Sequence, residues 1–267
     1  MNKGIPIFDS ITHPTINGNW LSEKYNGKAK MQDLILSMEE ENIKWGFAVG
    51  MKGVGDYNEV DFIKMIETSE SKLIPVAYFD FENIANGDIK TEIRRIKKMG
   101  YKGIKIHPRL SNINILNNDL IDIVKLANQE QLALLLCTYF YDCKENSYVN
   151  NIDNLQKFLY QTRDCKMILL HSGSVRLLEM MEIARAYKNI LLDLSLTLCK
   201  YKGSSLELDI KYMFEYFDTR ICIGSDHPEF SLTELRERFE YFSKGLSLQK
   251  RKNIAFQNII NYLDFEV

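Results

Sequence analysis

Short apolar runs alternate along the chain with segments in which apolar residues recur every three to four positions. The runs are rich in Leu, Ile and Val, and they begin near Ile5, Ile43, Leu73, Lys102, Leu132, Lys166, Asn189 and Arg220. Runs such as 132–136 and 167–170 are apolar at successive positions, which is typical of strands in a parallel sheet that helices cover. We therefore predict eight parallel β-strands.

Helices are predicted between these runs, because the apolar residues there follow the 3.6-residue period of an amphipathic helix. The expected helices are Met31–Glu41, Val60–Glu67, Ile89–Met99, Leu120–Glu130, Leu155–Gln161, Val175–Tyr187, Leu206–Phe217 and Leu232–Phe242. Ser231 and Glu234 have the capping-box spacing that begins a helix. The starts of successive runs lie about 30 residues apart, which is the length of one strand–helix unit.

Eight strand–helix units predict an α/β fold, a single-domain (β/α)8 TIM barrel over residues 1–267. A doubly wound open sheet is the alternative, and the even spacing of the eight units favours closure. No linker or low-complexity segment marks a second domain. Residues 246–265 are expected to form one further helix that closes the barrel.

Composition excludes several classes of protein. With 34 Lys and Arg against 36 Asp and Glu, the net charge is −2, which argues against a nucleic-acid-binding protein. No apolar run approaches the roughly 18 residues of a membrane span, and Asp9 interrupts the apolar centre that a signal peptide needs. We expect a cytoplasmic protein with five reduced cysteines. Its expected partner is a small-molecule substrate, and self-association into a homo-oligomer is left open.

All four histidines of the chain fall at or just after the ends of predicted strands. His13, His107, His171 and His227 follow or end the first, fourth, sixth and eighth strands, and Asp226 precedes His227. The carboxyl ends of barrel strands and the loops after them carry the active site in this kind of fold. The sequence therefore predicts a site at one rim of the barrel.

The alternation of side chains along the fourth strand adds binding groups to this rim. Lys105 and His107 share one face of the strand, while Ile104 and Ile106 share the other and suit packing against helices. Lys105 and His107 should then point into the barrel mouth, where a lysine needs an anion, a ligand or a metal site beside it. Lys105 and Arg109 are candidates for binding a substrate carboxylate or phosphate. The alternatives are that His107 binds loop backbone and that Arg109 is a solvated loop charge.

Four segments together resemble motifs of the amidohydrolase superfamily, in particular its amidohydrolase-related branch of metal-dependent hydrolases. They resemble, in chain order, the family's G-x-K-x-H-P strand, its H-x-G strand end, its N-x-x-x-D-x-S seventh strand and its G-S-D-x-P eighth strand. The segments are 103–108, 168–173, 189–195 and 224–228. The resemblance extends from Asp9 to about Asp226, which is nearly the whole predicted barrel.

This resemblance implies a mononuclear site for a divalent metal ion, held by His13, His171 and Asp226. Zinc is the ion that we expect there. Asp226 would also act as the general base, and His171 would be a ligand or an acid–base residue. The implied reaction is hydrolysis of a C–N or C–O bond in a small, polar, anionic substrate, through a metal-bound water. Relatives that cleave C–C bonds by decarboxylation provide an alternative reaction.

Two positions depart from the family pattern. Ile11 stands where the first histidine of the H-x-H pair is expected, and Cys137 stands near the usual fifth-strand histidine. We interpret Cys137 as a small buried apolar residue, with ligation as a thiolate as the alternative. Asp193 and Ser195 are expected to hold backbone of a loop or a neighbouring strand. The loss of expected ligands supports a rival function, a metal-free, non-catalytic barrel that binds a small molecule.

Overall fold

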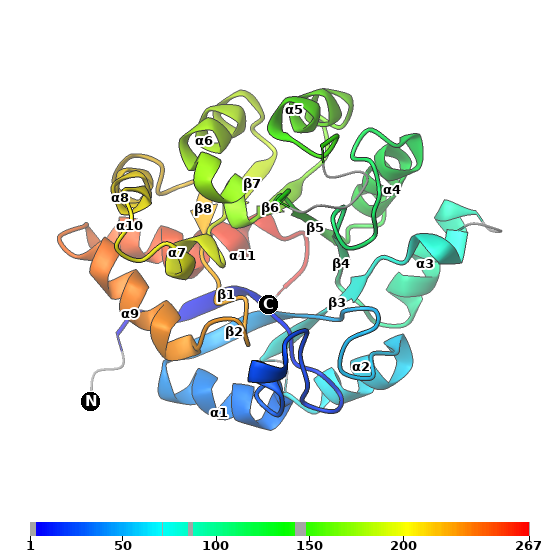
Figure 1. Ribbon diagram of the computed structural model, residues 1–267, viewed down its shortest axis with the longest axis horizontal. Coiled ribbons are helices and arrows are strands. Elements are labelled where there is room, and N and C mark those ends of the chain that lie inside the picture. The colour runs from blue at the N-terminus through cyan, green and yellow to red at the C-terminus, as the bar shows by residue number, and fades with distance from the viewer. Residues whose placement is uncertain (1–3, 71, 85–87, 142–147, 267) are drawn as a thin grey trace.

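The computed structural model describes residues 4–70, 72–84, 88–141 and 148–266. Eight strands form one parallel sheet whose spatial order follows the chain order. They are β1 (Ile7–Thr12), β2 (Ile43–Val49), β3 (Leu73–Tyr78), β4 (Gly103–Ile106), β5 (Ala133–Cys137), β6 (Met167–Leu170), β7 (Ile190–Asp193) and β8 (Ile221–Cys222). The strands lie inside a ring of helices, as Figure 1 shows. The predicted (β/α)8 barrel is confirmed.

Backbone hydrogen bonds join the last strand to the first. The backbone N–H of Asp226 donates to the carbonyl of Ile11 at 3.1 Å, and the N–H of His13 donates to the carbonyl of His227 at 2.8 Å. Thr12 and His227 form a parallel bridge between these two hydrogen bonds. The sheet therefore closes, and the alternative of an open doubly wound sheet is wrong.

The helices lie on the outside of the barrel. They are α1 (Met31–Glu40), α2 (Glu59–Glu67), α3 (Ile89–Lys98), α4 (Asn118–Gln129), α5 (Ile152–Gln161), α6 (Leu177–Ala186), α7 (Thr197–Lys200), α8 (Leu206–Tyr216), α9 (Leu232–Ser243), α10 (Leu248–Lys252) and α11 (Asn258–Tyr262). Helix α9 begins with the predicted capping box, in which the Ser231 hydroxyl accepts from the N–H of Glu234 and the Glu234 carboxylate accepts from the N–H of Ser231. No helix in the described ranges is long and apolar enough to cross a membrane.

One expected helix begins later in the structure, and one helix of the structure was not expected. The helix expected from Val175 begins at Leu177, because residues His171–Arg176 form a separate 3₁₀ segment. Within that segment Ser172, Gly173 and Ser174 have φ values of 44°, 65° and 59°. Such left-handed backbone is set by tertiary contacts, which a pattern of apolar residues does not report. Helix α7 was not predicted either, because its four residues are too few to show a period.

The alternation of side chains along the strands divides the core into two layers. Outward-facing residues such as Ile104 and Ile106 pack between the sheet and the helices, as predicted. Inward-facing residues such as Phe47 and Leu135 fill the barrel. Lys105 belongs to the inward set, and its exposed fraction is only 2%.

The C-terminal segment closes the end of the barrel at which the strands begin. Instead of one helix over 246–265, the chain forms α10, a π-helical turn (Asn253–Gln257) and α11, and the helix ends at Tyr262. Ile259 belongs to the core cluster inside the barrel together with Phe8 of β1. In Figure 1 the chain end accordingly lies at the centre of the ring of strands.

Candidate active site

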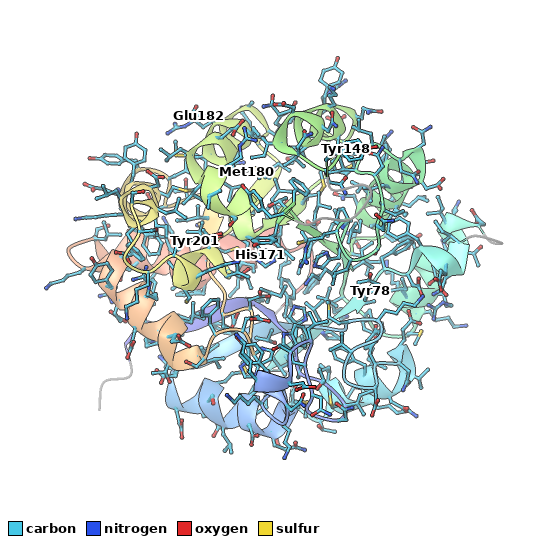
Figure 2. All side chains as sticks on the ribbon, in the orientation of Figure 1. Tyr78, Tyr148, His171, Met180, Glu182 and Tyr201 are labelled. Atoms are coloured by element: carbon cyan, nitrogen blue, oxygen red, sulfur yellow. The ribbon has the colours of Figure 1, made fainter. Side chains whose placement is uncertain are left out.

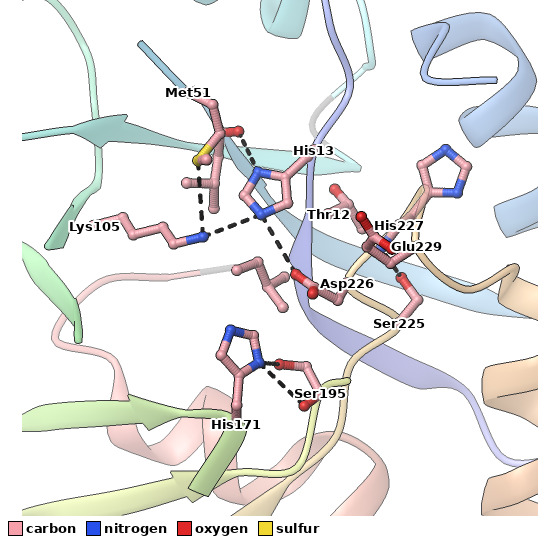
Figure 3. A network of polar contacts seen from close by, with 12 residues as sticks. Thr12, His13, Met51, Lys105, His171, Ser195, Ser225, Asp226, His227 and Glu229 are labelled. Atoms are coloured by element: carbon pink, nitrogen blue, oxygen red, sulfur yellow. Dashed lines mark hydrogen bonds and ion pairs between the residues drawn. The ribbon is translucent and has the colours of Figure 1, made fainter. Parts of the chain in front are cut away.

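The imidazole of His13 lies at the centre of a polar cluster at the carboxyl ends of the strands (Figure 3). Its Nδ1–H donates to the carbonyl of Val49 at 2.8 Å, so Nε2 is the acceptor nitrogen of the neutral ring. Nε2 lies 3.1 Å from Nζ of Lys105 and 3.5 Å from Oδ1 of Asp226. Burial and the charge of Lys105 lower the pKa of His13 to about 4. The ring is therefore neutral near pH 7.

Trp20 fixes the plane of this imidazole. The two rings stack with their centroids 4.7 Å apart and an interplanar angle of 26°. The indole N–H donates to Glu229 at 2.9 Å, which ties the first loop of the barrel to the loop after β8. Trp20 was not predicted, because nothing in the spacing of residues relates it to His13.

Lys105 reaches the same cluster from β4. Its amino group contacts His13 and lies 4.0 Å from Sδ of Met51. Burial lowers the pKa of Lys105, and the negative charge of Asp226 is the largest effect in the opposite direction. The prediction that this lysine faces the barrel mouth is confirmed, and its direct partner there is the imidazole of His13, with the anion Asp226 acting on it through its charge.

Asp226 supplies the carboxylate of the cluster from the loop after β8. Its exposed fraction is 7%. Burial acts to raise its pKa, but the charges of His171 and Lys105 together hold that pKa well below its usual range. Asp226 is therefore ionised at neutral pH.

His171 ends β6 and carries the opposite charge. Its Nδ1–H points to the carbonyl of Ser195 at 3.2 Å and to the hydroxyl of Ser195 at 3.1 Å. Burial acts to lower the pKa of His171, but the charge of Asp226 and the contact with Cys137 raise it to about 9. The side chain is an imidazolium near pH 7. Figure 2 shows His171 near the middle of the molecule, whereas Tyr148 and Glu182 lie toward its outside.

Cys137 lies between two histidines at the end of β5. Its exposed fraction is 1%, and the imidazoles of His107 and His171 act on its thiol. Burial acts to raise the pKa of the thiol, but the two imidazoles lower it well below its usual value. Cys137 is buried, as we interpreted it, but its partners are polar rather than apolar. The parity of β5 places it inside the barrel, and this was the signal available in the sequence.

The two remaining predicted binding residues lie on the loop after β4. His107 is buried, and its Nδ1 accepts the backbone N–H of Leu110 at 3.3 Å, so it binds loop backbone as well as Cys137. Arg109 is partly buried, with its guanidinium 5.5 Å from the ring centroid of Tyr139. The charge of Arg109 contributes to lowering the pKa values of Lys105 and His107. It therefore lies near the cluster.

His227 lies at the rim but points away from the cluster, as Figure 3 shows. Its ring faces the backbone of Lys28 and the charge of Asp33. The pairing of residue 227 with β1 turns consecutive side chains to opposite sides, so Asp226 faces inward and His227 outward. The prediction of one rim thus holds for the position of all four histidines, and three of the rings face the site.

Asp193 supports His171 from the end of β7. Its carboxylate accepts the backbone N–H groups of Ser195 at 3.0 Å and His171 at 3.3 Å, and the hydroxyls of Ser10 and Ser195. Burial raises the pKa of Asp193, and the charge of His171 opposes this. The prediction that Asp193 holds backbone of a neighbouring strand end is confirmed.

Asp9 supports the other side of the cluster. It accepts the hydroxyl of Ser225 at 2.6 Å and the backbone N–H of Ser225 at 2.8 Å, so it fixes the residue that precedes Asp226. Burial raises the pKa of Asp9 to about 7. Asp9 was not predicted as a supporting residue, although a carboxylate inside an apolar strand is a visible signal.

The predicted metal ligands do not form a ready-made metal centre. Within residues 4–70, 72–84, 88–141 and 148–266, no three or more His, Cys, Asp and Glu side chains are grouped as a metal ion needs. His13 and Asp226 approach each other to 3.5 Å, but the acceptor nitrogen of His13 already faces the amino group of Lys105. A catalytic zinc site needs about three protein ligands, so the donor set as placed does not fit one.

Comparisons with known proteins find the fold and little sequence similarity. No family model matches the chain, and no curated protein matches it significantly. Among solved structures, an uncharacterised TIM-barrel protein from Bordetella bronchiseptica is similar with a TM-score of 0.80 and 14% identity, over 97% of this chain and 98% of that chain.

The fold is also similar to those of two proteins whose names give an activity. One is described as a probable 2-pyrone-4,6-dicarboxylic acid hydrolase from Acinetobacter baumannii with citric acid bound, with a TM-score of 0.71, 14% identity and coverage of 98% of this chain and 100% of that chain. The other is a dihydroxybenzoic acid decarboxylase from a Polaromonas species with manganese and 2-nitroresorcinol bound, with a TM-score of 0.73, 12% identity and coverage of 97% and 96%. These similarities confirm the fold that the resemblance to the amidohydrolase superfamily implies.

Proposed function

We propose that the chain is an amidohydrolase-type enzyme that hydrolyses a C–N or C–O bond in a small, anionic, polar substrate. One observation carries this proposal: the ionised carboxylate of Asp226 is buried at the barrel mouth beside the positive charges of His171 and Lys105. A buried charge is costly unless it is paired, and a carboxylate next to an imidazolium is the pair that acid–base catalysis needs.

The charge of the cluster favours an anionic substrate. The charges of His171 and Lys105 hold the pKa of the Asp226 carboxylate low, and the charge of Arg109 acts on Lys105 from the loop after β4. In this proposal Lys105, His107 and Arg109 bind the substrate, with the planar guanidinium of Arg109 suited to a carboxylate. The citric acid bound to the Acinetobacter protein is an anionic ligand of a protein with this fold, which agrees with the proposal.

The proposed reaction uses Asp226 as the base and His171 as the acid. A water molecule attacks the carbonyl carbon of the substrate, and Asp226 accepts the proton that this water loses. Lys105 donates a hydrogen bond to the carbonyl oxygen as negative charge develops on it. His171 then donates its proton to the departing nitrogen or oxygen, and the bond to the carbonyl carbon breaks.

The family resemblance implies a divalent metal ion as the cofactor, with zinc as the expected ion and His13, His171 and Asp226 as its predicted ligands. The manganese described for the Polaromonas enzyme supports a divalent ion in proteins of this fold. Because these side chains are not grouped as three ligands, the steps above are assigned to protein groups alone. A cytoplasmic location and a homo-oligomeric state remain predictions.

Decarboxylation of an aromatic carboxylate is the second candidate, because the Polaromonas enzyme of the same fold is a decarboxylase. A substrate panel separates the two: lactones and N-acyl amino acids report hydrolysis as released acid, and hydroxybenzoates report decarboxylation as released CO2. Asp226→Asn should lower the rate of whichever reaction is found by at least about 100-fold. Asp153 is an exposed carboxylate on α5, and Asp153→Asn should leave that rate unchanged. Binding of citrate without turnover of any panel member would instead favour the non-catalytic barrel.

A further inference from the structure

The amino group of Lys105 lies beside the lone pair of His13 that a metal ion would use. His13 donates its Nδ1–H to Val49, which leaves Nε2 as the free acceptor, and Nζ of Lys105 lies 3.1 Å from that atom. Oδ1 of Asp226 lies 3.5 Å from the same Nε2. Figure 3 shows the three groups converging from the ends of β4, β1 and β8.

The other nearby donors are engaged elsewhere. Ile11, which precedes His13 by two positions, has no polar atom in its side chain and packs inside the barrel. His171 directs its Nδ1–H to the carbonyl and the hydroxyl of Ser195. Among the described residues, therefore, the pair of His13 and Asp226 has no third ligand grouped with it.

We propose that the amino group of Lys105 takes the place of a divalent metal ion in this centre, and that the protein works without metal. A lone pair that accepts an N–H from Lys105 is not available to a metal. A second cation beside a buried ammonium would also be repelled, and more strongly in the low-dielectric interior than in water. This inference rests on the proposed site but not on the reaction proposed for it.

The exchange of a metal for a lysine changes what the centre does. An ammonium group donates hydrogen bonds to an oxygen of the substrate, but it does not bind water as hydroxide. Deprotonation of the attacking water is then left to Asp226 alone. The centre should stay intact in a chelator, because no part of it can be removed by EDTA.

Metal content tests this proposal without a substrate. Wild-type protein purified without chelator should contain less than about 0.1 zinc, manganese or iron per chain by mass spectrometry, and cobalt(II) should give no visible ligand-field spectrum. Lys105→Met removes the amino group and keeps an unbranched side chain of similar length. At saturating cobalt(II) it should bind about one ion per chain through His13 and Asp226, with water as the remaining ligands, and give such a spectrum, and the double variant with Asp226→Asn should lose it. Lys102→Met, an exposed lysine one position before β4, is the matched control and should behave as the wild type.

Each outcome decides the question. A wild-type protein that carries about one metal per chain, lost in Asp226→Asn, would overturn the proposal. A metal-free wild type whose Lys105→Met variant folds but gains no cobalt site would also overturn it, because His13 and Asp226 would then not be a cation site that lysine fills. If Lys105→Met does not fold by circular dichroism, the metal content of the wild type decides. Because no turnover is measured, failure here is distinct from failure of the proposed reaction.

Discussion

His171 and Asp226 both have left-handed backbone conformations. His171, at the end of β6, has a φ of 65°, and Asp226, in the loop after β8, has a φ of 56°. For residues other than glycine this conformation costs about 1–2 kcal/mol, and it persists only where the surroundings impose it. The N–H of His171 is held by Asp193 and that of Asp226 by the carbonyl of Ile11. The proposed acid and base are thus positioned by the backbone of the barrel itself.

This pair predicts the pH dependence of the reaction. His171 must be protonated to act as the acid, and its pKa is raised to about 9, so kcat/KM should fall as the pH rises through about 9. Asp226 must be ionised, and its pKa lies well below the usual range, so activity should persist into acid solution. A pH profile of kcat/KM on the substrate found in the panel measures both limbs. An alkaline limb near the ordinary histidine pKa would contradict this assignment.

Cys137 should influence the pH at which kcat/KM falls in alkaline solution, because its interaction with His171 helps to raise the pKa of that histidine. Cys137→Ala removes that contact, and we expect the limb to move to lower pH by a measurable fraction of a unit. The matched control is Cys222→Ala, which replaces another buried cysteine inside the barrel whose own pKa is raised by burial. An equal shift in both variants would show a general packing effect instead of a specific contact.

Arg109 should contribute to binding of an anion. We expect Arg109→Met to weaken citrate binding about tenfold, which corresponds to about 1.4 kcal/mol, and the loss should shrink at high salt because the charge is screened. Isothermal titration calorimetry on the wild type, Arg109→Met and the control Lys102→Met measures the effect. If the two variants bind citrate equally well, Arg109 is a loop charge with no part in the site.

Asp9 predicts a stability that falls as the pH rises. Its pKa is raised by burial to about 7, so between about pH 4 and pH 7 the folded protein keeps a proton that the unfolded chain has lost. The free energy of unfolding should therefore fall with pH in this window by up to about 1.4 kcal/mol per unit, with no further loss from this group above pH 7. Urea denaturation of the wild type and Asp9→Asn at several pH values should show the difference between them. A difference that does not vary with pH would refute the raised pKa.

We expect that a side chain larger than hydrogen is not tolerated at Gly224, two residues before Asp226. A methyl group at this position would press on the side chains of Ser10 and Asp9 and lie 3.1 Å from the backbone nitrogen of Ile11. Gly224→Ala should therefore destabilise the protein by about 1–3 kcal/mol, and it should lower activity by displacing the neighbouring Asp226. At Gly245, where a methyl group would meet nothing within 4 Å, only the left-handed backbone opposes alanine, and the activity should be unchanged. Thermal denaturation and an activity assay measure the two effects separately.

The sequence predicts the fold well because a barrel repeats one simple pattern. Eight apolar runs and the helices between them are local signals, and parity along one strand is enough to turn Lys105 inward and Ile104 outward. The rim position of the histidines follows from the same rule.

What the sequence does not predict depends on contacts across the barrel. Two such contacts are the stacking of Trp20 on His13 and the hydrogen bond of Ser225 to Asp9. The outward direction of the His227 side chain is a third feature that depends on contacts across the barrel. The left-handed residues after β6 are likewise imposed by the fold, so an apolar pattern places the helix start at Val175 and not at Leu177. Whether a metal is bound depends on distances of a few tenths of an ångström, which motif spacing does not contain.

The C-terminal segment, which closes the end of the barrel at which the strands begin, affects how the chain can fold while it is being synthesised. Ile259 packs in the same cluster as Phe8, and Phe256 packs against that cluster, so the first strand and residues 256–259 share one interior. A nascent chain that has emerged from the ribosome only as far as α9 has every strand but an unfilled barrel floor. Such an intermediate would expose apolar surface to chaperones, and stalled chains ending near residue 250 should be more sensitive to protease than chains that extend past residue 262.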